Sequence, residues 1–415
     1  MRIAVLGNMN NNHFALCRYL WDLGLDIDLY VLKSDPAHFS IESDLYSSHF
    51  LKKIITIDLK ISDFPDRMDR YDLTWLNNYD IIVSEGIAAG FLRYFNIKTH
   101  VFTPYGGDIY HLPFFRRKNN LKTLLARAKR GLLKRTFLFP KEIFSKYQFN
   151  AIKECDLLIA YTHEWKEEFK KLQIKGQIAK IPIPMIYLND YSPESLRKFA
   201  KISLIKNEID KLKVRFDFLY LNHSRQYWKN HGKGEIDLMS NKGNDKLIVG
   251  FAEFLKKTNS NSCLILLEYG VDVQASKELI RSLNIEDSVY WFGIQPRREI
   301  MLLIESVDIV CNAFNNSWIG NGVIFETLSM GKPLMGFRDD SLYDLNEFGH
   351  KSLYPMINVK EVDEITQALM EYEDNPQYFK NLGLEGKEWY EIEVVEKSTN
   401  FYREYFNSKK RELSI

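Results

Sequence analysis

Short apolar stretches alternate with longer stretches of helical period along most of the chain. Many of the apolar stretches are continuous rather than alternating, which is typical of strands buried on both faces of a parallel sheet. A first series of strands is predicted at Arg2–Leu6, Ile27–Leu32, Ile54–Ile57, Ile81–Val83, His100–Thr103, Leu157–Ala160 and Ile178–Ile181. A second series is predicted at Phe216–Leu221, Cys263–Leu267, Val289–Phe292, Ile309–Cys311 and Pro333–Gly336. The predicted fold class is therefore α/β, with two Rossmann-like domains facing a cleft.

Length and one connecting segment predict how the chain divides into domains. A chain of 415 residues exceeds what one hydrophobic core usually supports. The stretch IPIPMIYLNDYSPESLRK lies between the two series of strands, and its prolines stiffen the connection. We predict one Rossmann-like domain over 1–190, a second over 191–385, and a helical segment over 386–415 that crosses back to the first domain.

Composition excludes several classes of protein. The hydrophobic fraction of 45% is that of a globular chain, and 56 basic against 55 acidic residues give no overall charge that favours nucleic acid. The cysteines are scattered and are predicted to be reduced core thiols, at Cys17, Cys155, Cys263 and Cys311. The chain opens on a strand, and no apolar run is long enough to span a bilayer. We expect a cytoplasmic protein.

The stretch NSWIGNGVIFETLSMGKPLMG, from Asn316 to Gly336, is the first candidate for chemistry. It follows a predicted strand, and ligands of open α/β sheets bind beyond the carboxyl ends of the strands. Gly320 and Gly322 would tolerate positive φ and let backbone approach a ligand closely. The predicted helix from Val323 to Met330 would offer free N–H groups to a phosphate. Glu326, one turn in, could accept hydrogen bonds from ribose hydroxyls. The alternative is an ordinary strand-to-helix connection with a Glu that complements the helix dipole.

Two cations are predicted to lie at the same edge of the second sheet. Arg225 follows the first strand of that domain, and Lys242 precedes an amphipathic helix. Arginine offers a planar donor fork and lysine a compact charge, a combination that suits a diphosphate. The alternative is two ordinary surface cations.

These motifs together resemble a known family. Arg225 after a strand is followed by KGND, then VYWFGIQPRREIMLLIESVDIVCNAF, then GNGVIFETLSMGKPLMG. This order resembles the carboxyl domain of retaining GT-B glycosyltransferases of family 4. GNMNNNHFALCRYLWDLGLDIDLYVL and TPYGGDIYHLPF resemble segments of the amino domain of that family. The resemblance covers most of the chain and implies a GT-B fold, an amino-terminal acceptor domain and a carboxyl-terminal donor domain.

The resemblance assigns roles in the donor domain residue by residue. It implies that Arg225 and Lys242 bind the donor diphosphate. Glu326 matches the second glutamate of the paired-glutamate signature, which holds the ribose. Gly293 and Ile294 match the backbone that receives the base.

In the amino domain, the resemblance places Asn8 in a loop that faces donor and acceptor, and Asp108 opposite the transferred sugar. His111 lies beside the same segment and is expected, with Asn8 and Asp108, near the reacting groups; a hydrogen-bonded structural histidine is the alternative. One position departs from the family, because Trp318 stands where the first signature glutamate is expected. The polar neighbours that could substitute for it are Asn315, Asn316, Ser317 and Asn321.

The resemblance implies a reaction that needs neither a cofactor nor a metal, with a UDP-linked sugar as donor and retention of configuration. Asp26 and Asp28 form a DxD pattern, but it opens a predicted strand, which is the wrong edge of a sheet for a ligand. Two alternatives stay open. One is a sugar-nucleotide 2-epimerase of the same fold, and the other is a non-catalytic subunit that binds a sugar nucleotide or glycan.

A basic amphipathic stretch covers residues 116–135. No acidic residue occurs from Ile109 to Lys141, and leucines recur there at helical spacing. An apolar stripe among cations suits an anionic membrane surface, where a lipid-linked acceptor would lie on the inner face of the cell membrane. The alternative is a helix packed on the core with a solvated basic face. Nucleic acid is not expected as a partner.

Overall fold

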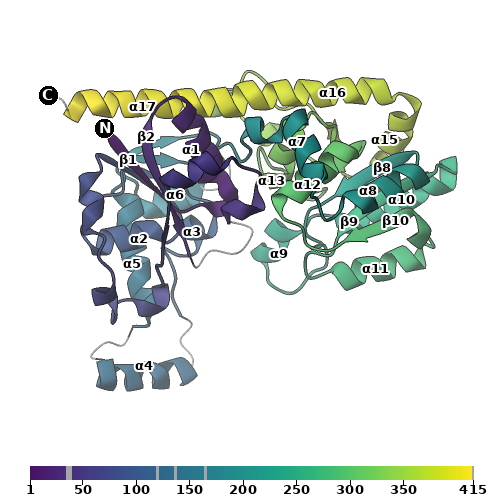
Figure 1. Cartoon of the computed structure of the whole chain (residues 1–415). Coiled ribbons are helices and arrows are strands. Elements are labelled where there is room, and N and C mark those ends of the chain that lie inside the picture. Colours follow the sequence, from purple (N-terminus) through teal and green to yellow (C-terminus); the bar gives the residue numbers. More distant parts are fainter. Residues whose placement is uncertain (34–39, 118–120, 135–137, 163–165, 414–415) are drawn as a thin grey trace. The chain divides into compact units, whose positions relative to one another are not determined.

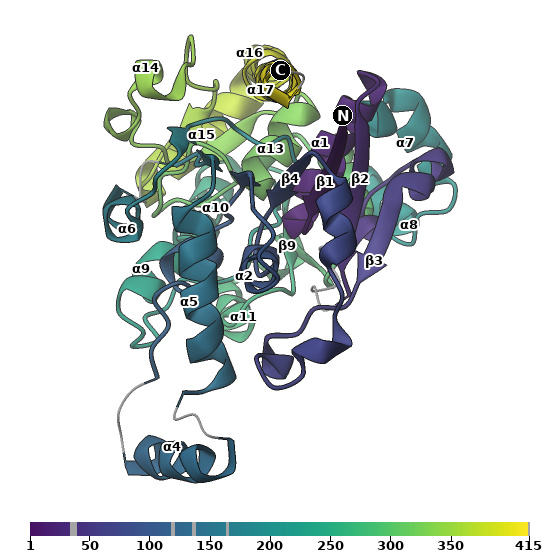
Figure 2. The ribbon, with the colours of Figure 1, turned by 90° about the vertical axis from the view of Figure 1, so that its left-hand side faces the viewer.

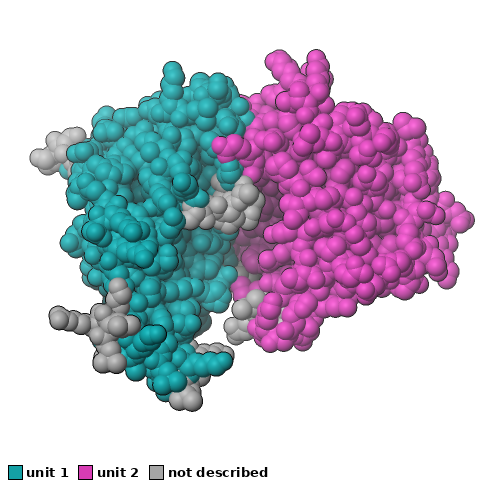
Figure 3. Space-filling view, turned by 60° about the horizontal axis from the view of Figure 1, so that its bottom comes forward, with its two compact units in different colours: residues 1–41, 46–183, 398–415 teal, residues 42–45, 184–397 magenta. Residues whose placement is uncertain are grey.

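A computed structural model describes residues 1–33, 40–117, 121–134, 138–162 and 166–413 of the chain (Figure 1). The chain forms two compact units, coloured separately in Figure 3. Unit 1 comprises Met1–Ile41, Tyr46–Ile183 and Ser398–Ile415, and unit 2 comprises Glu42–Leu45 and Pro184–Lys397. The change of unit therefore falls between Ile183 and Pro184, a little before the predicted boundary at residue 190.

Unit 1 is built on a seven-stranded parallel sheet of order β3-β2-β1-β4-β5-β6-β7. Its strands are β1 (Arg2–Leu6), β2 (Asp26–Leu32), β3 (Ile54–Ile57), β4 (Ile81–Ser84), β5 (Val101–Phe102), β6 (Leu157–Ile159) and β7 (Gln177–Ala179). Its helices are α1 (Asn12–Asp22), α2 (Ala88–Tyr94), α3 (Gly107–Tyr110), α4 (Leu121–Lys134), α5 (Pro140–Lys153), α6 (Lys166–Leu172) and α17 (Lys397–Leu413). The central strands are buried on both faces, which is why they read as unbroken apolar runs.

Unit 2 is built on a six-stranded parallel sheet of order β10-β9-β8-β11-β12-β13. Its strands are β8 (Phe218–Asn222), β9 (Ser262–Leu267), β10 (Val289–Phe292), β11 (Ile309–Cys311), β12 (Leu334–Gly336) and β13 (Ile357–Asn358). Its helices are α7 (Pro193–Ala200), α8 (Lys206–Arg215), α9 (Glu235–Ser240), α10 (Asn244–Thr258), α11 (Val273–Ser282), α12 (Arg297–Ser306), α13 (Gly322–Ser329), α14 (Leu345–Phe348), α15 (Val362–Asp374) and α16 (Pro376–Trp389). The predicted α/β class with two Rossmann-like domains is confirmed.

The structure also places the cysteines, the DxD pattern and one strand that the sequence did not predict. The four cysteines are buried and free, as predicted for core thiols. Asp26 and Asp28 open β2, and Asp28 accepts a hydrogen bond of 2.5 Å from the Tyr79 hydroxyl, so the DxD pattern does mark the start of a strand. The edge strand β13 was not predicted, because two residues are too few to show a period.

The carboxyl-terminal part of the chain is helical from Pro376 to Leu413. α16 continues through a π-helical segment, Tyr390–Glu396, into α17. Residues from Ser398 onward belong to unit 1. Within the described ranges, each helix is either too short or too polar to cross a bilayer.

Candidate functional site

The candidate site of unit 2 lies where the order of the strands along its sheet reverses. β8 and β11 are neighbours at the centre of the sheet, with β9 and β10 on one side and β12 and β13 on the other. This is a topological switch point, and the loops beyond the carboxyl ends of two such strands form the usual ligand site of a doubly wound sheet. The loop after β8 carries His223 and Arg225, and the loop after β11 carries Trp318 and Gly320.

Lys242 joins the two loops through its backbone. Its N–H donates to the carbonyl of Tyr227 at 2.7 Å, and its carbonyl accepts from the N–H of Phe314 at 2.8 Å. The Asn316 side chain adds a bond of 2.6 Å to the carbonyl of Asn241. Gly243 follows at φ +64°, a conformation that favours glycine, and directly precedes α10. The backbone of Lys242 therefore bridges the loops that follow β8 and β11.

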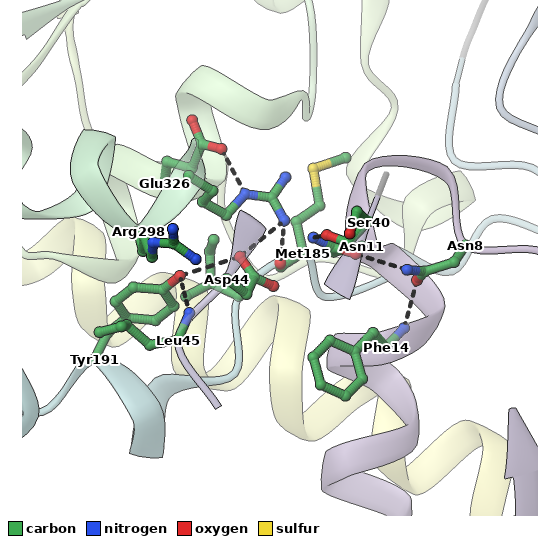
Figure 4. Close-up of polar contacts among 12 residues, drawn as sticks. Asn8, Asn11, Phe14, Ser40, Asp44, Leu45, Met185, Tyr191, Arg298 and Glu326 are labelled. Carbon is green, nitrogen blue, oxygen red and sulfur yellow. Dashed lines mark hydrogen bonds and ion pairs between the residues drawn. The ribbon is translucent and has the colours of Figure 1, made fainter. Parts of the chain in front are cut away.

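Glu326 is the buried carboxylate of this site. Its Oε1 accepts from Nε of Arg297 at 2.9 Å (Glu326 is labelled in Figure 4). Its Oε2 lies 2.9 Å from Nε2 of His223. A second carboxylate, Asp44, lies 3.6 Å from the Arg297 guanidinium, which also donates to the carbonyl of Met185 at 3.2 Å. Buried charges are stable only when they are paired in this way.

The pKa values follow from these pairings. Burial alone would raise the pKa of Glu326, but the hydrogen bond from His223 and the positive charge of Arg297 outweigh it and lower the pKa. For Arg297, burial works against the charged form, whereas Asp44 and Glu326 together raise its pKa. Glu326 is therefore a permanent anion near neutral pH, suited to accepting hydrogen bonds and unsuited to donating a proton.

Arg297 and Asp44 were not singled out from the sequence. Arg297 opens α12, a few residues beyond the carboxyl end of β10, so the rule that located Arg225 could also have located it. Asp44 gave no comparable signal. It lies among residues of the amino-terminal half, in the short segment Glu42–Leu45 that belongs to unit 2. Tyr191 holds this segment, because its hydroxyl donates to Asp44 at 3.0 Å and accepts from the N–H of Leu45 at 3.2 Å (Figure 4).

The glycine turn differs in one respect from the prediction. Neither Gly320 nor Gly322 has a positive φ, and Gly322 is the first residue of α13. It leaves open space instead, because a Cβ there would have only the Glu326 carboxylate oxygens nearby, at 3.8 and 4.0 Å. Asn321 caps the helix, and its side-chain oxygen accepts from the N–H of Ile324 at 3.0 Å. Val323 is half-buried in the first turn.

The remaining predicted donor residues lie closer to solvent. Arg225 is exposed, with its guanidinium carbon 5.8 Å from the centre of the Tyr227 ring. Gly293 and Ile294 follow β10 and are exposed, Ile294 to 71%. Gly320 is half-buried. These residues remain accessible to a ligand of unit 2.

Trp318, the departure from the family pattern, contacts Lys242. The lysine Nζ lies 5.4 Å from the centre of the indole ring, a cation–π distance. The Tyr354 hydroxyl donates to the carbonyl of Trp318 at 2.7 Å and fixes the backbone. The indole N–H is buried and has no acceptor among the described residues. An aromatic face therefore lies beside one of the cations that are proposed to bind phosphate.

In unit 1, the loop after β1 is held by its own polar side chains. Asn8 is fully buried; its amide donates to Asn11 at 2.6 Å and its oxygen accepts from the N–H of Phe14 at 2.9 Å (Figure 4). His13 lies between the carbonyl of Gly7 at 3.0 Å and the Thr103 hydroxyl at 2.8 Å. Burial lowers the pKa of His13 to about 4, against the raising effect of the Gly7 carbonyl, so the ring is neutral at pH 7.

Asp108 and His111 lie at opposite extremes of exposure. Asp108 is 1% exposed, and its carboxylate accepts three backbone N–H bonds, from Gly86, Tyr105 and Gly106, at 3.0 to 3.1 Å. Burial raises the pKa of Asp108 to about 6, although each of these donors lowers it. The carboxylate therefore organises the loop around it. His111 is exposed at the end of α3.

In the basic helix α4, two arginines contact other segments and two leucines are exposed, which is the reverse of a helix that packs its leucines on the core. Arg127 pairs with the buried Glu142 at 2.6 Å, and Arg130 pairs with Asp66 at 3.2 Å. Leu124 and Leu125 are 52% and 64% exposed. Two arginines of the basic stretch 116–135 are therefore held by carboxylates from distant segments. The side chains of Lys118, Lys134 and Arg135 lie outside the described residues.

Comparison with known proteins gives matches among solved structures. No protein-family profile and no curated protein sequence matches the chain. HepE from Anabaena in complex with UDP superposes with a TM-score of 0.58 at 14% identity, covering 98% of this chain and 100% of that one. The apo form of the lipopolysaccharide outer core galactosyltransferase WaaB gives 0.53 at 14% identity over 99% and 100%. The UDP-GlcNAc 2-epimerase of Neisseria meningitidis bound to UDP-GlcNAc gives 0.50 at 13% identity over 98% and 100%.

The chain has the GT-B fold. The likeness extends over nearly the whole of each chain, so both Rossmann-like units take part in it. At identities of this order a GT-B likeness establishes architecture only, and the reaction has to be inferred from the side chains of the site.

Proposed function

We propose that the chain is a glycosyltransferase that transfers a sugar from a UDP-linked donor to a glycan or lipid-linked acceptor in cell-surface polysaccharide or glycolipid synthesis. The observation that carries the proposal is the grouping of Lys242, the open turn at Gly322 and the anionic Glu326 at the switch point of the sheet. HepE, which has been solved with UDP and with UDP-glucose, has the same fold.

The diphosphate of the donor would lie between cations and a helix amino terminus. Lys242 is half-buried and held over Trp318, whereas Arg225 is exposed and free to move toward a ligand. Together with the first N–H groups of α13, they would neutralise the charge that develops on the leaving UDP. No cofactor is needed for this step, and we propose that it proceeds without a metal.

The ribose of the donor would meet Glu326. Each carboxylate oxygen already accepts one hydrogen bond from the protein and has a further lone pair. The missing side chain at Gly322 leaves room next to these oxygens. The two ribose hydroxyls are donors that fit such an anion. We infer from the family resemblance that configuration is retained.

Isothermal titration with UDP and GDP tests the donor site. We expect Arg225→Ala and Lys242→Ala each to weaken UDP binding by about 1–3 kcal/mol, the usual range for charge-assisted hydrogen bonds. Lys229→Ala is the matched control, because Lys229 is an exposed cation of the same loop. Equal UDP affinity in the wild type and all three variants would remove Arg225 and Lys242 from the site.

A 2-epimerase of the same fold is the alternative that one neighbour raises. Such a reaction needs a group that takes up and returns a proton, and the lowered pKa of Glu326 makes this carboxylate a poor proton donor. Incubating the protein with UDP-GlcNAc in the absence of an acceptor distinguishes the two. An epimerised free sugar nucleotide would contradict the transferase proposal, and tight UDP binding without turnover of any UDP-sugar would indicate a non-catalytic subunit.

We further propose that α4 contacts an anionic membrane on the cytoplasmic face. Leu124, Leu125, Lys122 and Lys129 are exposed, while Arg127 and Arg130 serve as tethers. An apolar face rimmed by cations is typical of interfacial helices. Co-flotation with phosphatidylglycerol vesicles at low salt should be lost in Leu124→Ser/Leu125→Ser. Flotation that is unchanged in this variant would refute the orientation.

A further inference from the structure

A cavity of about 360 Å³ opens in unit 1 beside the base of α4. This volume lies within the range of small-molecule binding pockets. Three segments line it. They are Ile61 and Ser62, then Phe115 and Arg117, then Phe139, Pro140 and Lys141. Apart from Arg117, which lies in the basic stretch 116–135, these residues belong to none of the sites described above.

The cavity combines two cations with two aromatic rings. The Arg117 guanidinium carbon lies 4.2 Å from the centre of the Phe139 ring, and the Lys141 Nζ lies 4.4 Å from the centre of the Phe115 ring. Both cations are exposed, and neither is paired with a carboxylate anywhere in the described part of the chain. The rings orient the charged groups at the wall without neutralising them. Ser62 adds an exposed hydroxyl.

Glu142, an acid next to the lining residue Lys141, is already neutralised. Glu142 is 1% exposed, and its carboxylate accepts from the backbone N–H groups of Arg117 and Phe139, both at 3.0 Å, and from the Arg127 side chain at 2.6 Å. Burial alone would raise the pKa of Glu142, but these three donors lower it, so the ionised group is balanced by Arg127. Glu142 thus fixes two walls of the cavity and leaves the charges of Arg117 and Lys141 uncompensated.

The position of the cavity agrees with that of a ligand site. Ile61 and Ser62 follow β3 closely, and Phe115 and Arg117 lie in the connection that leaves β5 and leads to α4. Pro140 and Lys141 open α5, which runs back toward the start of β6. All three segments therefore belong to the carboxyl edge of the sheet, the edge where α/β folds bind ligands. Figure 2 shows α4 just beyond the amino-terminal end of α5.

We propose that this cavity binds the phosphate of an anionic amphiphile, with the phosphate between Arg117 and Lys141 and the start of the apolar chain against Phe115 and Phe139. A phosphate needs cations without partners, and an apolar chain needs aromatic walls, and the cavity offers both within a few residues. The exposed leucines of α4 lie close to the cavity residues in the sequence, so the rest of the ligand's apolar chain would continue along an apolar surface. The binding does not depend on the sugar-transfer reaction.

Isothermal titration with monomeric decyl phosphate tests the proposal, with inorganic phosphate and decyl maltoside as the two half-probes. We expect one molecule of decyl phosphate per chain and binding at least tenfold weaker for either half-probe, because each lacks one of the two features. Decyl maltoside that binds as tightly as decyl phosphate would overturn the proposal, as would no binding of decyl phosphate.

Variants then locate the site. Arg117→Gln/Lys141→Gln should weaken decyl phosphate binding at least tenfold, whereas Lys122→Gln/Lys129→Gln removes the same charge from α4 and should change it less than twofold. Arg117→Lys/Lys141→Arg, which keeps both charges, should retain most of the affinity and guards against misfolding of the first variant. Equal affinity in the wild type and Arg117→Gln/Lys141→Gln would refute the assignment.

Two sources of such a phosphate can be separated with short probes. Dihexanoyl phosphatidic acid represents a bilayer lipid, and geranyl phosphate represents an isoprenoid carrier of a glycan. Binding of either that is lost in Arg117→Gln/Lys141→Gln supports the site, and the tighter of the two identifies the source. If both probes bind this variant as they bind the wild type, the cavity is not their site.

Discussion

The pair formed by Arg297 and Glu326 offers the sharpest test of how the donor site is held. Both side chains are about nine-tenths buried, and Arg297 Nε lies 2.9 Å from Oε1 of Glu326. Removing one partner of a buried ion pair leaves an uncompensated charge and costs about 3–5 kcal/mol. Asp44 remains 3.6 Å from Arg297, so we expect Glu326→Gln to cost about 3 kcal/mol, at the lower end of that range.

A double-mutant cycle isolates the pair. Arg297→Gln alone should cost at least as much, because it also removes the cation beside Asp44, whereas Arg297→Gln/Glu326→Gln removes both charges of the pair and leaves only Asp44 without its arginine. We therefore expect the double variant to be more stable than the sum of the single losses predicts, by about 2–3 kcal/mol, the upper range for residues in direct contact. Urea unfolding followed by circular dichroism measures this, provided that the m-values stay constant.

UDP binding, measured on the same three variants, distinguishes a structural role of Glu326 from direct contact with the nucleotide. If Glu326 accepts ribose hydroxyls, Glu326→Gln should weaken UDP binding more than Arg297→Gln does, since only the first removes a ligand contact. If the losses of the two single variants add up to the loss of the double variant within about 0.5 kcal/mol, the coupling is refuted, because independent sites behave in that way. UDP affinity that is equal in both single variants would make Glu326 a purely structural carboxylate.

Two further predictions concern His13 and Trp318. Burial lowers the pKa of His13 from 6.5 to about 4. As the pH falls, the unfolded chain therefore takes up the His13 proton before the folded chain does. The contribution of neutral His13 to the free energy of unfolding is complete above pH 6.5, and about 3 kcal/mol of it is lost as the pH falls toward 4. The difference in unfolding free energy between the wild type and His13→Gln should shrink accordingly between pH 7 and pH 4.5, and a constant difference would contradict the shifted pKa. Trp318→Ala should weaken UDP binding about twofold to fivefold by releasing Lys242, since a cation–π contact that is partly exposed contributes about 0.5–1 kcal/mol, whereas Trp318→Phe should retain most of the affinity. Titration calorimetry that finds Ala and Phe equivalent would exclude this role of the ring.

The sequence by itself determined which segments form the sheets and predicted the edge of unit 2 at which a ligand would bind. The strands are unbroken apolar runs because both faces of each central strand are covered, and this property is visible locally. The order of strands and loops then located Lys242 and Glu326 at one edge of the sheet, since parallel strands end together. The exception was β13, whose two residues carry no period.

Only the tertiary structure decided which partners these residues take. Glu326 is bound by Arg297 and by His223, which lies 103 positions away in the chain, and no local pattern encodes such a pairing. The same is true of α4, where the amphipathic period predicted a helix but could not tell which face points inward. Glu142 and Asp66, from other segments, hold its arginines and leave Leu124 and Leu125 in solvent. Periodicity follows from the backbone geometry of one element, whereas orientation and ion pairing depend on the charges and surfaces that folding brings next to it.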